Sequence, residues 1–201
     1  MHAVIKGLVV ASLLAAGFAV HHHHDWFFGT QDDKKQDAKK QDAGGMPAPP
    51  QPTDEHKWLA EGAGKWKAVG KIHTGPDQTV PMEGIQTNTM QQGGLWQIID
   101  YKENSGGFAG HGVSGYDTEK KKFVSVWVDS MTTQASIGEG TLSPDKKSLG
   151  LLFDMPGPDG KMMKVQETIT RKDDKTTTLD MSSVGADGKL TKMLEITYTK
   201  M

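Results

Sequence analysis

A histidine between two glycines, His111, is the residue of this sequence whose surroundings best suit chemistry. A neutral imidazole can ligate a metal or a haem iron, or act as a general base. Flanking glycines allow a ligand or another chain segment to approach the backbone closely. The alternative is a histidine that is hydrogen-bonded within a strand and has no chemical role.

The partner of His111 depends on the register of a predicted hairpin. One register pairs His111 with Val128, whereas a slip of one residue pairs it with Asp129 and puts Trp127 on the same face. Only the second register brings the histidine together with a carboxylate inside a site. An enzyme that uses Asp129 or Glu195 with His111 is therefore one hypothesis, although no residue is assigned a catalytic role.

Carboxylates in predicted strands are the other candidates for acid–base chemistry. Glu167 lies between Val165 and Ile169 in an alternating pattern, and Glu195 shares a face with Met193, so either side chain could point inward and be charge-paired. A glycosidase-like pair needs two carboxylates at a fixed separation, which the sequence does not establish. The sequence contains neither Gly-x-Ser-x-Gly nor His-Glu-x-x-His, and neither His56 nor His73 shares a metal-site spacing with His111. We therefore predict no metal site and no cofactor, and favour binding over catalysis.

Aromatic residues at alternating strand positions are most simply explained as a packed core, and the alternative is the wall of a ligand pocket. Methionines spread along the same strands add flexible apolar surface. The residues that we expect at the wall or mouth of a ligand pocket are Trp96, Tyr101, His111, Tyr116 and Trp127.

The composition limits the classes of partner. A chain of 201 residues has room for one domain with extensions, and a net charge of -2 favours neither nucleic acid nor an acidic membrane surface. Arg171 is the only arginine, which argues against bidentate phosphate recognition. Because the chain has no cysteine, disulfides and thiolate metal sites are excluded.

Residues 1–20 are typical of an export signal, with Lys6 as the positive charge and Leu8 to Val20 as the apolar run. That run is shorter than the ~20 residues that span a bilayer, so no stable membrane span is expected after cleavage. The predicted location is the periplasm or the medium. Cleavage after Ala19 would place His21 near a new amino terminus able to chelate Cu(II) or Ni(II), although an exposed His21–His24 tract or tag is the simpler interpretation.

Residues 21–52 are predicted to form a disordered, low-complexity tether, and residues 53–201 a folded domain. Thr53 is a plausible N-cap for a short helix that ends by Gly62 and Gly64. Period-2 alternation then predicts a strand over 66–72 and further strands at about 80–91, 94–103, 108–116, 122–130, 134–142, 148–154, 161–171, 175–183 and 189–199. About ten short antiparallel strands with tight turns predict an all-β, closed up-and-down barrel, with a β-sandwich as the alternative.

The opening Gly64-Lys65-Trp66 resembles the Gly-x-Trp start of calycin (lipocalin-like) barrels. The motifs Gly93 to Trp96, Gly110 to Gly112, Gly115 to Asp117, Lys121 to Val124, Trp127 to Met131 and Met193 to Tyr198, together with Asp187-Gly188-Lys189, resemble the bacterial family known as domain of unknown function 1579. The resemblance covers about residues 53–201. It implies a calycin-like barrel and brings no catalytic residues.

These observations predict an exported barrel that binds a small apolar or amphipathic molecule in its interior. One alternative is a barrel that holds haem or another cofactor through His111. Another is an envelope structural or interaction module whose barrel is filled by side chains. The sequence fixes neither the oligomeric state nor whether the barrel is hollow.

Overall fold

Alternating apolar and polar residues shape ten strands in the described part of the chain, which is residues 48–157 and 160–201 of a computed structural model. The strands follow one short helix, α1 (Asp54–Glu61). They are β1 (Gly64–Gly75), β2 (Gln78–Met90), β3 (Trp96–Glu103), β4 (Ala109–Asp117), β5 (Lys122–Asp129), β6 (Ser136–Leu142), β7 (Ser148–Pro156), β8 (Met162–Arg171), β9 (Thr176–Val184) and β10 (Leu190–Lys200).

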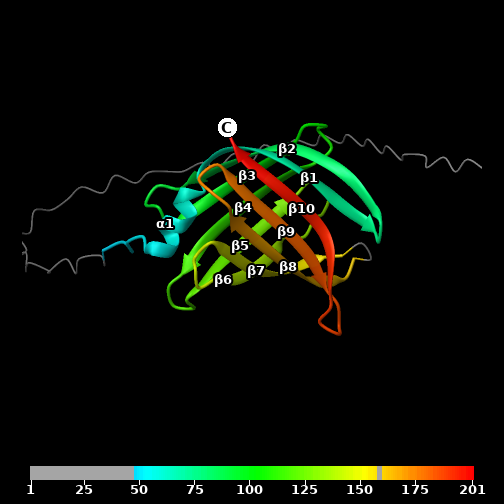
Figure 1. Ribbon diagram of the computed structural model, residues 1–201. Helices are drawn as coiled ribbons and strands as arrows, with labels where there is room; N and C mark the ends of the chain where they lie inside the picture. Colours follow the sequence, from blue (N-terminus) through cyan, green and yellow to red (C-terminus); the bar gives the residue numbers. More distant parts are fainter. Residues whose placement is uncertain (1–47, 158–159) are drawn as a thin grey trace, which may run out of the picture. The chain divides into compact units, whose positions relative to one another are not determined.

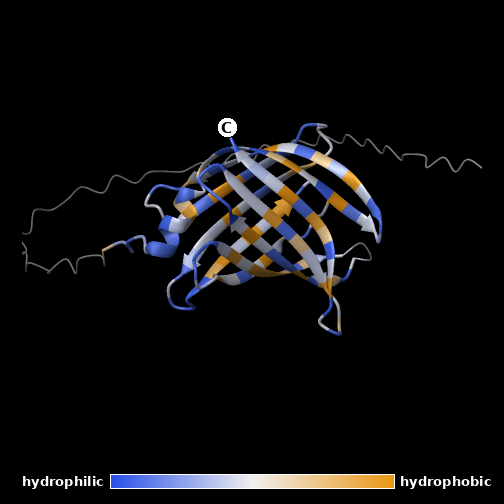
Figure 2. Ribbon diagram, in the orientation of Figure 1, coloured by the Kyte–Doolittle hydropathy of each residue, from blue (hydrophilic) through white to orange (hydrophobic). Residues whose placement is uncertain are grey.

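Each strand pairs antiparallel with its neighbour in the chain, and β1 also pairs with β10, so the sheet closes into a barrel (Figure 1). The closed up-and-down barrel predicted from the sequence is confirmed, and the β-sandwich alternative is wrong. Closure leaves no unpaired sheet edge. Hydrophobic and hydrophilic residues alternate along the strands in Figure 2, as expected where one face of a sheet lines the interior and the other meets solvent.

The predicted signal peptide, residues 1–20, and most of the predicted tether lie outside the described residues, as do His21–His24. Residues 48–52 are described and are exposed, without helix or strand. The described part of the chain contains no helix that is long and apolar enough to cross a membrane.

Helix α1 begins after Thr53, the predicted N-cap, and its buried side chains are His56, Trp58 and Leu59. The backbone N–H of Thr53 donates to Nδ1 of His56 at 3.0 Å, so this ring nitrogen is the unprotonated one. Burial lowers the pKa of His56, which favours the same neutral state. Trp58 and Leu59 join Phe123, Leu149, Leu151, Phe153 and Val165 of the barrel in one hydrophobic cluster.

The C-terminal carbonyls of α1 bond to side chains of the barrel. Such groups have no partner within a helix, so each one placed against protein needs a donor from elsewhere. Arg171 Nη2 donates to Trp58 O, and Gln97 Nε2 donates to Leu59 O at 2.6 Å. The carbonyl of Gly62 accepts from Trp66 Nε1 and Asn88 Nδ2, each at 3.1 Å.

Arg171 fastens α1 to β8 through three kinds of contact. Besides its bond to the Trp58 carbonyl, its Cζ lies 3.7 Å from the centroid of the Trp58 ring, and its Nη1 pairs with Glu61 Oε2 at 2.8 Å. A positive charge at the C-terminus of a helix is also favourable for the helix dipole. The planar guanidinium can stack and donate at once, which explains why an arginine suits this position.

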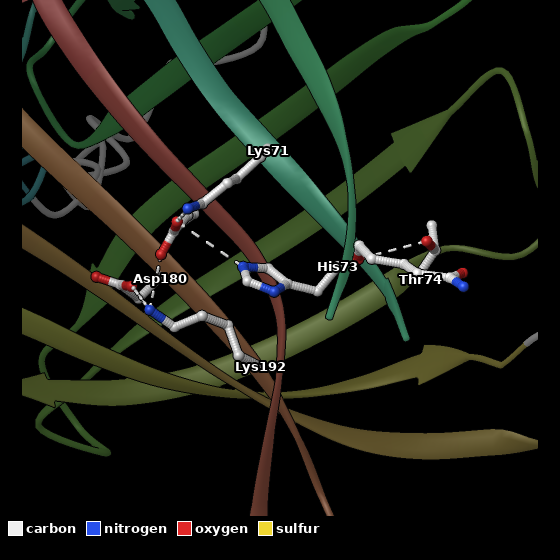
Figure 3. A network of polar contacts seen from close by, with 7 residues as sticks. Lys71, His73, Thr74, Asp180 and Lys192 are labelled. Atoms are coloured by element: carbon white, nitrogen blue, oxygen red, sulfur yellow. Dashed lines mark hydrogen bonds and ion pairs between the residues drawn. The ribbon is translucent and has the colours of Figure 1, made fainter. Parts of the chain in front are cut away.

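The outer face of β1, β9 and β10 carries a polar network (Figure 3). Glu195 Oε1 lies 2.7 Å from Lys71 Nζ and 3.8 Å from His73 Nε2, while Lys192 Nζ lies 3.1 Å from Asp180 Oδ1. Glu195 was a candidate to face the interior. It instead faces outward, because it pairs across the ladder with Lys71, and it is not available to a site inside the barrel.

Replacing Arg171 with methionine should lower the free energy of unfolding by about 2 kcal/mol, because the Trp58 carbonyl loses its donor and the Trp58 ring loses its cation. Urea denaturation measures this change. The exposed neighbour Lys172, replaced by methionine, is the matched control and should leave stability nearly unchanged. Equal destabilisation by both substitutions would contradict the role of Arg171 in holding α1 against β8.

Candidate functional site

The interior of the barrel encloses a cavity of about 300 Å³. This volume is at the lower end of the range for small-molecule sites. Its wall is mostly apolar and includes Leu151, Phe153, Ile169, Leu179 and Ile196, from β7, β8, β9 and β10. Side chains of α1, Trp58 and Leu59, contribute to the wall as well.

Trp127 lines the cavity and explains the glycines around His111. The β4–β5 register pairs Gly112 with Trp127, and a Cβ added to Gly110 would lie 2.0 Å from Trp127 Cζ2. The indole therefore covers the backbone at both glycines, and its Nε1 donates to Asp129 Oδ2 at 3.1 Å. The close approach that these glycines allow is made by a side chain of the protein itself.

His111 faces away from the cavity. Its partner is Val128, so the first of the two registers is the one that forms. Its Nδ1 lies 2.7 Å from Oδ1 of Asp100 on the neighbouring strand β3, and its side chain is 49% exposed. A His–Asp pair thus exists, but with Asp100 and on the outer face. An interior haem would find no ligand in His111.

Two further predicted pocket residues also lie outside the cavity. Trp96 is 44% exposed on the outer face, where its ring covers Gly115 of β4. Tyr116 packs beside α1, with its ring 5.9 Å from that of His56 and 5.2 Å from that of Phe123. It belongs to the surroundings of the helix and does not line the cavity.

Tyr101 lies inside the barrel and lines the cavity with Trp127. Its ring packs against Gly84, where a Cβ would lie 2.5 Å from the hydroxyl oxygen. The hydroxyl is buried and has no hydrogen-bond partner among the described residues. Burial raises the pKa of Tyr101 to about 12, so the phenol is a neutral donor. The structure thus brings together two of the five predicted residues, and their role in binding stays a prediction.

Glu167 is an acidic group of the cavity wall. It faces inward from β8, as alternation with Val165 and Ile169 allowed, and its neighbours across the ladder are Leu151 and Met181. The expected charge partner is missing, since its carboxyl makes no hydrogen bond or ion pair with the described residues. Burial raises the pKa of Glu167 to about 7.

Several other polar groups of the wall are already paired. Arg171 and Gln97 bond to carbonyls of α1, Asn88 bonds to the carbonyl of Gly62, and Ser114 Oγ lies 2.9 Å from Ser125 Oγ. Glu167 and Tyr101 therefore retain the capacity to bind a polar group of a ligand. Sequence alternation could place both inside, but it could not show that they lack partners.

The described residues include no group of three His, Cys, Asp or Glu side chains placed to hold a metal ion.

Comparison with known proteins places the chain in a family. The sequence model of a family described as "Protein of unknown function (DUF1579)" matches residues 51–200. This agrees with the resemblance seen in the sequence. No curated protein matches the chain.

A comparison with solved structures finds similar chains at low sequence identity. An S-type phycobiliprotein lyase, CPES from Guillardia theta, is 10% identical with a TM-score of 0.50, over 73% of this chain and 92% of that chain. The structure of EF1p2_mFAP2b bound to DFHBI is 14% identical with a TM-score of 0.36, over 73% of this chain and 98% of that one. A redesigned barrel, b11L5F_LGL, is also 14% identical, with a TM-score of 0.34 over 71% and 94%.

Replacing Glu167 with glutamine should change how stability depends on pH. Because the folded pKa, about 7, exceeds the ordinary 4.5, the folded state holds this proton longer, and the wild type loses stability as pH rises between these values. Above this window, the substitution should stabilise the protein by about 2 to 3 kcal/mol. Below it, the effect should vanish.

Urea denaturation across this pH range tests the expectation. Glu83→Gln, an exposed carboxylate on β2, is the matched control and should track the wild type at each pH. A Glu167→Gln curve that stays parallel to the wild-type curve would contradict the assignment of a lone interior carboxyl.

Proposed function

The chain belongs to the family described as "Protein of unknown function (DUF1579)", and on that premise we propose that it binds one small apolar or amphipathic molecule inside its barrel. The observation that carries the proposal is the apolar cavity of about 300 Å³. Its wall can surround a small ligand, and burial of apolar ligand surface contributes roughly 25 cal/mol per Å².

An unfilled interior lowers the stability of a barrel, and this cost supports a binding role for the cavity. Engineered cavities cost about 24 cal/mol per Å³, so a volume of this size corresponds to several kcal/mol of packing that larger side chains would have gained. A purely structural module gains nothing from this arrangement.

The position of His111 does not support the cofactor alternative. Its imidazole is paired with Asp100 on the outer face, so it does not supply an axial ligand to a haem held inside the barrel. A small organic ligand needs no such group. The apolar wall and the two spare polar groups, Glu167 and Tyr101, suit an amphipathic molecule.

We expect Ile169→Trp to reduce the affinity for the neutral fluorescent probe N-phenylnaphthylamine by at least about tenfold, because the indole takes up cavity volume. Ile137→Trp on the outer face, where Ile137 is 58% exposed, is the matched control and should bind the probe like the wild type. Circular dichroism checks that both variants fold. Equal probe affinity in the two variants would contradict an interior site.

Export is the second part of the proposal, and it rests on residues 1–20. Their basic start, apolar run and small residues before Val20 suit cleavage by a signal peptidase. Mass spectrometry of the protein made in a bacterial host should give a mature chain that begins at Val20. A chain that keeps Met1 and stays in the cytoplasmic fraction would contradict export.

A further inference from the structure

We propose that the ligand of the barrel carries a protonated amine that pairs with Glu167. This inference rests on the proposed function and adds the chemical class of the ligand. It starts from the position of the carboxyl on β8, on the cavity wall between Leu151 of β7 and Met181 of β9. No described residue donates a hydrogen bond to this carboxyl or forms an ion pair with it.

A buried charge of this kind is costly unless a partner compensates it. Ionising Glu167 without a partner is unfavourable, which is why burial raises its pKa to about 7. A ligand that brings a positive charge removes this cost. The apolar neighbours then cover the rest of the ligand.

The other titratable side chains that line the cavity do not neutralise Glu167. Arg171, four residues further along β8, is paired with Glu61 and donates to the Trp58 carbonyl. Asp129 of β5 accepts from Trp127 Nε1 and from the backbone N–H of Met131, at 3.1 and 2.8 Å. The remaining two, Tyr101 of β3 and Tyr198 of β10, are neutral phenols.

Tyr198 and Tyr101 strengthen the case for a cation. The pKa of Tyr198 is raised by burial and further by the charge of Glu167 and by Tyr101, so the three groups act on one another within the same interior. The hydroxyl of Tyr101 has no partner among the described residues. Aromatic faces attract cations, and a phenol oxygen accepts a hydrogen bond from an ammonium group.

Other head groups fit less well. A carboxylate would be repelled by Glu167 and would find Arg171 already paired. An alcohol could donate one hydrogen bond but would leave the negative charge without compensation. An amine does both, because it donates hydrogen bonds and carries the opposite charge.

The pairing predicts that amine affinity rises with pH. An alkylamine stays protonated to about pH 10, so over the neutral range only the carboxyl changes its charge. Glu167 loses its proton as pH rises through about 7, and the ion pair becomes available. An alcohol ligand should show a much smaller dependence.

Isothermal titration calorimetry with octylamine, octanol and octanoate tests the proposal, since these probes share one apolar body and differ in the head group. At about pH 8.5, octylamine should bind at least about tenfold more tightly than octanol, and octanoate more weakly than either. At about pH 5.5 the preference for octylamine should largely disappear.

Glu167→Gln should abolish both the octylamine preference and its pH dependence. Glu83→Gln on the outer face is the matched control and should behave like the wild type. Octylamine and octanol of equal affinity in the wild type, or a preference that survives in Glu167→Gln, would overturn the proposal.

The same titrations distinguish a failure of interior binding from a failure of the amine pairing. If none of the three probes binds the wild type, the interior binding function itself fails. If octanol binds but octylamine has no advantage, only the amine inference fails. Should Glu167→Gln not fold, the ratio of affinities in the wild type and its change with pH decide the question.

Discussion

The contact of Arg171 with Trp58 is the interaction on which the rest of the barrel depends. It joins the C-terminal end of α1 to β8 by stacking, by a hydrogen bond to a helix carbonyl and by an ion pair with Glu61. Gln97, Trp66 and Asn88 bind the neighbouring carbonyls, so the helix ends against the barrel without unpaired acceptors at these positions. The single arginine of the chain thus serves the fold.

The same hydrogen bonds affect the polarity of the cavity. They pair polar side chains near α1 with helix carbonyls, and the wall beyond these side chains is largely apolar. Glu167 lies in that apolar part of the wall, two residues before Ile169 and four before Arg171 on β8. A carboxyl in such a place is the feature that a barrel built only for stability would replace, since a leucine there would gain packing and avoid the cost of desolvation.

Much of the fold followed from the sequence because each strand is a local pattern. The predicted strand 108–116 is observed as Ala109–Asp117, and alternation alone placed Tyr101 and Glu167 on positions that prove to be inward. Which neighbours meet across the sheet was not predictable. A slip of one residue decides whether His111 faces Asp129 or the outside, and its pairing with Asp100 depends on a second register. The size of the cavity depends on all ten registers together.

The most direct test of an interior binding site is nuclear magnetic resonance of the methyl-labelled protein with octanol. An interior site should give nuclear Overhauser contacts between the ligand and the methyl groups of Leu151, Ile169 and Leu179, which line the cavity. The methyl groups of Ile137 and Leu152, exposed on the outer face, should show none. Contacts confined to the outer methyl groups would show that the barrel binds such molecules on its surface and would contradict the account.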